Sequence, residues 1–110
     1  MAKYLLLYRA PVRFGEQMAQ GAPEDAAAGM EAWMTWAGKA GDALVDLGQP
    51  LDSVSAEGAD LGNGGGFVCG FSIMEADSTD ALKALLDGHP HLSMPEGAIE
   101  ILEFQPVPGM

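Results

Sequence analysis

The sequence has one cysteine, five basic residues and no apolar run long enough to cross a membrane, which takes about 20 residues. Cys69 alone excludes an internal disulfide framework and favours a reducing, cytoplasmic location. Sixteen acidic residues leave a net charge of -11, which repels phosphate backbones and anionic lipid. Nucleic acid and membrane are therefore excluded as expected partners.

The rest of the composition is that of a globular protein. Hydrophobic residues make up 48% of the 110 positions and charged residues 19%, so a packed core is expected. The apolar start of the chain is too short for a signal peptide core and is interpreted as a strand. With no internal repeat or linker, residues 1–110 are predicted to form a single domain.

The pattern of side chains predicts four strands and two helices. Pro23 suits the first position of a long helix, and Gly48 is placed to cap its end. Asp77 or Ser78 can cap a second, short helix whose apolar face is Leu82, Leu85 and Leu86 and which ends near Gly88. Strands are predicted over residues 3–9, 49–57, 67–75 and 98–105, with a loop over 12–22 and a hairpin turn at Asn63-Gly64.

The order of these elements is β-α-β-β-α-β, which predicts an α+β, ferredoxin-like fold. Its four-stranded antiparallel sheet carries both helices on one face. The first strand is apolar on both sides, with Tyr4, Leu6 and Tyr8 opposite Leu5 and Leu7. A bare apolar sheet face exceeds what soluble monomers expose, so we expect a homodimer in which two sheets pack as a dimeric α+β barrel.

Several segments along nearly the whole chain resemble the YCII-related family, including its DGPF-type and YciI-like members, within the dimeric α+β barrel superfamily. The segments are Lys3–Tyr8, Trp33 with Trp36, Asp42–Gly48, Gly70–Ile73, Pro90–Leu92 and Ile99–Ile101. The resemblance implies a small homodimer with a pocket between sheet and helices. It also implies relatives that act as small-molecule lyases or dehydrochlorinases through a histidine and an aspartate.

The chain departs from that family at two places. The DGPF tetrapeptide is replaced by Asn63-Gly64-Gly65-Gly66-Phe67, and the region of the first helix contains no histidine. Only His91, within Pro90-His91-Leu92, stands where the family has a histidine. The chemistry of the YciI-like enzymes is therefore not carried over to this chain.

His91 is the first candidate for a catalytic role, because histidine changes charge near neutral pH. Glu100, or Glu103, on the last strand is expected to orient it. The alternative is that His91 caps a helix or bonds a backbone carbonyl. His89 and His91 form His-x-His, but four clear ligands mark a structural zinc site, so no metal is expected.

Four further residues are candidates for ligand binding. Arg9 can clamp a carboxylate, or it can form a surface ion pair. Tyr8 and Trp33 suit the walls of a pocket, with Trp33 or Trp36 also suited to the core. Ser72 offers a hydroxyl. The glycine-rich 62–66 segment lacks the lysine of a phosphate loop, so no cofactor is expected.

Three functions remain open from the sequence. The first is binding of a small metabolite, with an anion as a candidate, together with proton-transfer chemistry of the lyase or isomerase type. The second is a non-catalytic dimeric accessory or protein-interaction module, favoured by the sparse set of reactive residues. The third is a cofactor-independent oxygenase, which needs a larger pocket.

Overall fold

The structure, a computed structural model, describes residues 1–62 and 65–109. The predicted turn at Asn63-Gly64 lies outside these residues. The elements, in chain order, are β1 (Ala2–Ala10), α1 (Phe14–Gln20), α2 (Pro23–Ala40), η1 (Gly41–Ala43), β2 (Leu44–Asp46), β3 (Phe67–Ala76), α3 (Thr79–Leu85), η2 (Pro90–Ser93) and β4 (Ala98–Glu103). Within these ranges no helix is long and apolar enough to cross a bilayer.

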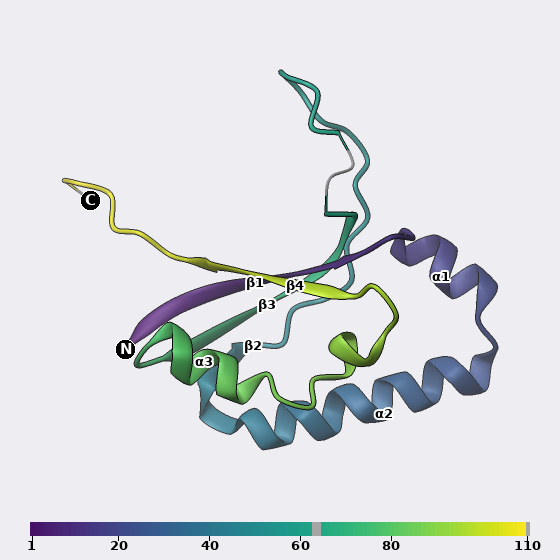
Figure 1. Cartoon of the computed structure of the whole chain (residues 1–110), viewed down its shortest axis with the longest axis horizontal. Coiled ribbons are helices and arrows are strands. Elements are labelled where there is room, and N and C mark those ends of the chain that lie inside the picture. The colour runs from purple at the N-terminus through teal and green to yellow at the C-terminus, as the bar shows by residue number, and fades with distance from the viewer. Residues whose placement is uncertain (63–64, 110) are drawn as a thin grey trace.

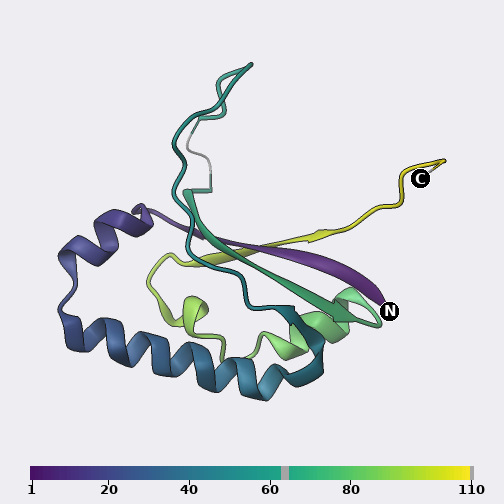
Figure 2. The ribbon, with the colours of Figure 1, turned by 180° about the vertical axis from the view of Figure 1, so that it is seen from behind.

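The four strands form one antiparallel sheet in the order β2-β3-β1-β4. The two strands adjacent in the middle, β1 and β3, come from the two halves of the chain. Figure 1 shows the helices below the sheet, and Figure 2 shows the same layering from behind. The predicted α+β, β-α-β-β-α-β architecture is therefore confirmed.

The core lies between the sheet and the helices. Tyr4, Leu6 and Tyr8 of β1 are buried there with Trp36 of α2 and Leu82 of α3. Ser78 caps α3 as predicted, because its side chain accepts a hydrogen bond from the backbone N–H of Ala81. Period-two alternation along β1 thus decides which side chains enter the core.

The other side of the sheet, here called the open face, has no helix over it in the described residues. Cross-strand pairing places eleven side chains of the three long strands on it. They are Lys3, Leu5, Leu7 and Arg9 of β1, Val68, Phe71, Ile73 and Glu75 of β3, and Ala98, Glu100 and Leu102 of β4.

A bulge in β3 shifts which of its side chains face the core. The register shifts between Tyr8 and Arg9, so that Tyr8 pairs with Gly70 but Arg9 pairs with Val68. Cys69 is the extra residue and is buried. Val68 therefore joins Phe71 on the open face, although strict alternation would place them on opposite faces.

The second strand was predicted at 49–57 and lies at Leu44–Asp46 instead. The cause is that α2 ends at Ala40, where Gly41 takes a positive φ of 60°, rather than at Gly48. Gly48, with φ 79°, serves a different purpose: a Cβ there would lie 1.8 Å from the carbonyl oxygen of Phe71. After it, Pro50 makes one isolated bridge to Gly70 and the chain leaves the sheet.

The predicted loop at 12–22 contains the helix α1. In α2 the buried residues lie in the second half of the helix. The Glu16–Gln20 residues favour helix, and the Gln17 amide donates to the carbonyl of Val12 at 2.6 Å. In α2, Met30 and Met34 are exposed, whereas Trp36 and Ala40 are buried. The first half of α2 therefore presents its small and apolar residues to solvent.

Candidate functional site

Four elements meet at a buried chain of hydrogen bonds beneath α2. The hydroxyl of Tyr8 donates to Ser72 Oγ at 2.7 Å, and Ser72 donates to the carbonyl of Leu47 at 2.5 Å. The Nε2 atom of His89 lies 3.3 Å from the Tyr8 hydroxyl. All three side chains are less than 5% exposed. The chain of bonds therefore ties β1, β3, the segment after β2 and the turn after α3 together.

The partners of His89 assign its proton. The backbone N–H of His91 donates to His89 Nδ1 at 3.0 Å, so Nδ1 is an acceptor and Nε2 carries the hydrogen. The donors then run in one direction, from His89 through Tyr8 and Ser72 to a carbonyl that holds no proton. This arrangement fixes positions and offers no route for a proton to leave.

The ionisation of both titratable members is suppressed. Burial, with the adjacent His91 imidazole adding to it, lowers the pKa of His89 from 6.5 to about 4. Burial raises the pKa of Tyr8 to about 12, partly offset by the hydrogen bond to Ser72. At neutral pH both side chains are therefore uncharged.

Aromatic rings enclose the imidazole of His89. The ring of Trp36 lies 4.2 Å from it, and the ring of Trp33 lies 4.6 Å away, edge to face. Trp33 also packs edge to face on Tyr8 at 4.8 Å. The indole Nε1 of Trp36 donates to the carbonyl of Leu85. Trp36 is thus a core residue, while Trp33 stays partly exposed over the Tyr8–His89 contact.

The predicted pairing of His91 with Glu100 is wrong. His91 Nε2 donates to the backbone carbonyl of Arg9 at 2.8 Å on the helix side of the sheet. Glu100 stands on the open face, where Leu7 is its cross-strand partner. The sheet separates the two groups, because adjacent β4 residues alternate between its faces. The alternative reading of His91, a bond to a backbone carbonyl, is the one that the structure supports.

Arg9 also lies away from the buried chain of bonds. Its Nε donates to Glu100 at 2.8 Å in an ion pair, and its NH1 group donates to the carbonyl of Gly66 at 3.4 Å. The expected anion clamp beside Tyr8 and Trp33 is therefore replaced by an ion pair on the open face. The backbone of Arg9 faces His91 and its side chain faces the opposite way.

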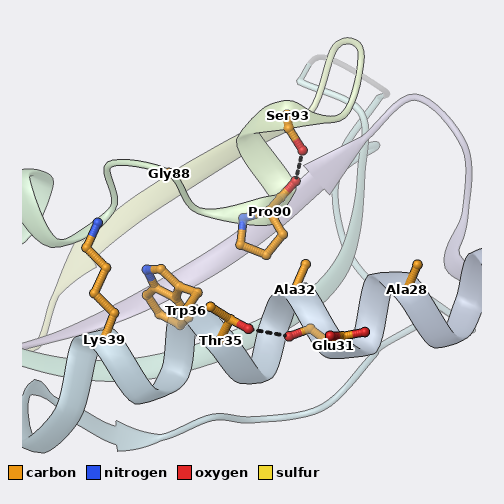
Figure 3. Close-up of a pocket in the computed structure, with 9 residues that line it drawn as sticks. All are labelled: Ala28, Glu31, Ala32, Thr35, Trp36, Lys39, Gly88, Pro90 and Ser93. Atoms are coloured by element: carbon orange, nitrogen blue, oxygen red, sulfur yellow. Dashed lines mark hydrogen bonds between the residues drawn. The ribbon is translucent and has the colours of Figure 1, made fainter.

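A groove of about 580 Å³ lies between α2 and the turn that carries His89 (Figure 3). Its lining residues are Ala28, Glu31, Ala32, Thr35, Trp36, Lys39, Gly88, Pro90 and Ser93. Trp36 belongs both to this lining and to the aromatic enclosure of His89. The groove and the buried hydrogen bonds are therefore separated by one layer of side chains.

The lining of the groove includes one positive and one negative side chain. Lys39 lies near Gly88, where its Nζ donates to the carbonyl of Asp87 at 3.3 Å, and Glu31 lies two helical turns earlier. The hydroxyls of Thr35 and Ser93 are bonded to the carbonyls of Glu31 and Pro90. A rise of 1.5 Å per residue puts Lys39 and Glu31 about 12 Å apart along the helix.

The two histidines are not arranged as metal ligands. His89 accepts from the backbone of His91, and His91 donates to Arg9. Across residues 1–62 and 65–109, no three His, Cys, Asp or Glu side chains come together as a ligand set.

His89 and Lys39 were not among the predicted site residues. Both histidines sit in the turn after Gly88, which has a positive φ of 78°, and both are buried, so residue type alone does not tell them apart. Lys39 carried a weaker signal, one cation in the last turn of α2. Of the predicted residues, the structure brings together Tyr8, Ser72 and Trp33, and places Arg9 and Glu100 as a separate pair.

Comparisons with known proteins do not assign a function to this chain. No protein-family model matches the chain. No curated protein matches it either. Among solved structures, the chain is similar to the 5-chloro-2-hydroxyhydroquinone dehydrochlorinase of Burkholderia phenoliruptrix AC1100 in complex with 2,5-dihydroxybenzoquinone. That similarity covers 91% of each chain at 18% identity, with a TM-score of 0.45.

Proposed function

We propose that the protein binds a small organic acid in the groove between α2 and the 88–93 turn. The observation that carries this proposal is the position of Lys39 at one end of an apolar floor formed by Ala32, Trp36 and Pro90. A volume of about 580 Å³ lies within the range of small-molecule sites, and such sites combine an apolar lining with a few polar groups.

The two charges of the lining give the ligand an orientation. A carboxylate is attracted to Lys39 and repelled by Glu31, so the apolar body of the ligand lies toward Ala32. Lys39 is one of only five cations in a chain of net charge -11. Its local attraction therefore has to act against a repulsive field, which favours ligands with a single negative charge.

The buried hydrogen bonds support binding by holding the floor in place. Trp36 packs on His89, and His89 is bonded through Tyr8 and Ser72 to the sheet. A floor fixed before the ligand arrives reduces the entropy lost on binding.

The same bonds favour binding over catalysis. His89 and Tyr8 are uncharged at neutral pH, and both nitrogens of His89 are already engaged. Proton-transfer activity of the lyase or isomerase type would require this chain of bonds to open. We therefore rank it second, and membership of the YCII-related group stays a prediction from the sequence segments.

A homodimer through the open face is the second part of the proposal. Leu5, Leu7, Phe71 and Ile73 form an apolar band across β1 and β3, with Leu102 beside it on β4. A monomer would leave this band in water, at a cost proportional to its apolar area. This surface also supports the alternative function, a dimeric accessory or protein-interaction module.

The ligand is tested by measuring thermal stability with benzoate, phenylacetate and indole-3-acetate, each beside its uncharged amide. We expect at least one acid, and not its amide, to raise the melting temperature of the wild type by mass action. Lys39→Met should remove the increase, whereas Lys83→Met, a cation of α3 outside the groove lining, should keep it. Equal effects of acids and amides, no effect of any acid, or equal loss in both variants would contradict the proposal.

A further inference from the structure

Two segments project beyond the sheet on the side of the open face (Figures 1 and 2). The first is the arm, residues 53–62, within the connection between β2 and β3. The second is the tail, residues 104–109, after β4. Every residue of both is exposed. The helices occupy the opposite side of the sheet, so the open face lies between two extended pieces of chain.

Both projecting segments carry large apolar side chains in solvent. Val54 and Leu61 of the arm are 96% and 78% exposed, and Phe104 and Val107 of the tail are 49% and 56% exposed. Single exposed apolar residues are common on protein surfaces. Here exposed apolar side chains recur on both segments beside an uncovered apolar face, which indicates that this surface packs against another molecule.

The dimensions of the chain also indicate a missing neighbour. Its radius of gyration is 15.0 Å, whereas a compact domain of this length has about 13 Å. Residues 47–66 connect β2 to β3 without a helix or strand of their own in the described part. Connections longer than about 12 to 15 residues are uncommon in compact domains and are usually functional.

The charge distribution favours a second copy as the neighbour. On the open face Lys3 is the cross-strand partner of Glu75, and Arg9 is ion-paired with Glu100, so the charges of the face cancel. The whole chain carries -11. The open face is therefore a place where two copies can approach without strong like-charge repulsion, and it has no acidic excess to attract a basic partner.

We infer that the second copy packs between the arm and the tail. The apolar side chains of these segments in each protomer are then buried against the other, namely Val54, Leu61, Phe104 and Val107. This rests on the proposed dimer and specifies its partner contacts. Pro106 and Pro108 restrict the tail to extended conformations, which lowers the entropy lost when it docks.

Sedimentation velocity over 1 to 100 μM tests whether the arm and the tail contribute to dimerisation. We compare the wild type with the Phe104→Ser/Val107→Ser double variant of the tail and with the Val54→Ser/Leu61→Ser double variant of the arm. Met30→Ser is the control, since Met30 is also an exposed apolar residue but lies on α2. We expect each arm or tail variant to raise the dimer dissociation constant at least tenfold, equivalent to about 1.4 kcal/mol, and the control to leave it unchanged.

The outcomes separate the two claims. A wild type that stays monomeric at 100 μM contradicts the dimer itself. If the wild type forms a dimer and neither the arm variant nor the tail variant changes its dissociation constant, the arm and tail contacts are contradicted and the sheet-to-sheet dimer is not. Circular dichroism and melting temperatures of the variants verify that each one is folded, because all of the substituted side chains are exposed in the single chain.

Discussion

His89 Nε2 and the hydroxyl of Tyr8 lie 3.3 Å apart in the interior, under two tryptophan rings. The two residues are 81 positions apart in the chain, and their contact closes the turn after α3 onto the central strand β1. The Tyr8 hydroxyl accepts a hydrogen bond from His89 and donates one to Ser72, so a single hydroxyl satisfies two buried hydrogen-bonding partners. Several consequences of this shared hydroxyl can be measured.

Replacing Tyr8 by Phe should destabilise the fold by roughly 1 to 3 kcal/mol. The ring still fills its place, but His89 loses an acceptor and Ser72 loses a donor, and both are buried. Denaturant unfolding measures the change. Tyr4→Phe is the matched control, since its hydroxyl makes one part-buried contact to Thr79 at 3.4 Å. Equal losses in the two variants would show that the Tyr8 hydroxyl has no special role.

Acid should weaken the fold through His89. Its folded pKa of about 4 is below its ordinary value of 6.5, so the unfolded chain takes up the proton first. Stability is unaffected above pH 6.5, falls as the pH decreases toward 4, and is roughly 3 kcal/mol lower at pH 4 from this residue alone. Protonation of Nδ1 would also remove the acceptor for the His91 N–H.

The comparison of wild type with His89→Gln isolates this effect, because every other titrating group is common to both. The free energy of unfolding, measured from pH 7 to pH 4, should fall more steeply in the wild type. Parallel curves would mean that His89 is protonated in the folded protein as readily as in the unfolded chain.

Gly48→Ala should be strongly destabilising, by more than about 2 kcal/mol, because the new Cβ would meet the Phe71 carbonyl and φ there is positive. Gly38→Ala is the opposite case. A Cβ at position 38 of α2 meets nothing within 4 Å, so the substitution should stabilise by roughly 0.5 to 1 kcal/mol. Urea unfolding measures the change in the free energy of unfolding for each variant. Changes of the same sign would contradict the assigned role of Gly48.

The features set by local pattern could be predicted from the sequence. The alternation of Tyr4, Leu6 and Tyr8 against Leu5 and Leu7, Pro23 at the start of α2, and Ser78 as the cap of α3 are all found in the structure. Each depends on the chemistry of residues adjacent in the chain. Together with the order of elements, they were enough to predict the fold.

The features set by register could not be predicted. A bulge beside Cys69 and an early helix end at Gly41 each shift the chain, and a shift of one residue moves a side chain to the other face of a sheet. Glu100 was expected beside His91 because the two are close in the chain, and it lies across the sheet from His91 because its side chain points to the open face. The site therefore centres on His89 and Lys39, whose positions depend on tertiary packing.

The most direct test of the proposed site uses the fluorescence of Trp36 in a Trp33→Phe chain, where it is the one remaining tryptophan. We predict that phenylacetate changes this fluorescence with a saturable dependence on concentration, that phenylacetamide does not, and that Lys39→Met removes the response. A signal that phenylacetate leaves unchanged, or that the acid and amide change equally, would contradict an anion site against Trp36.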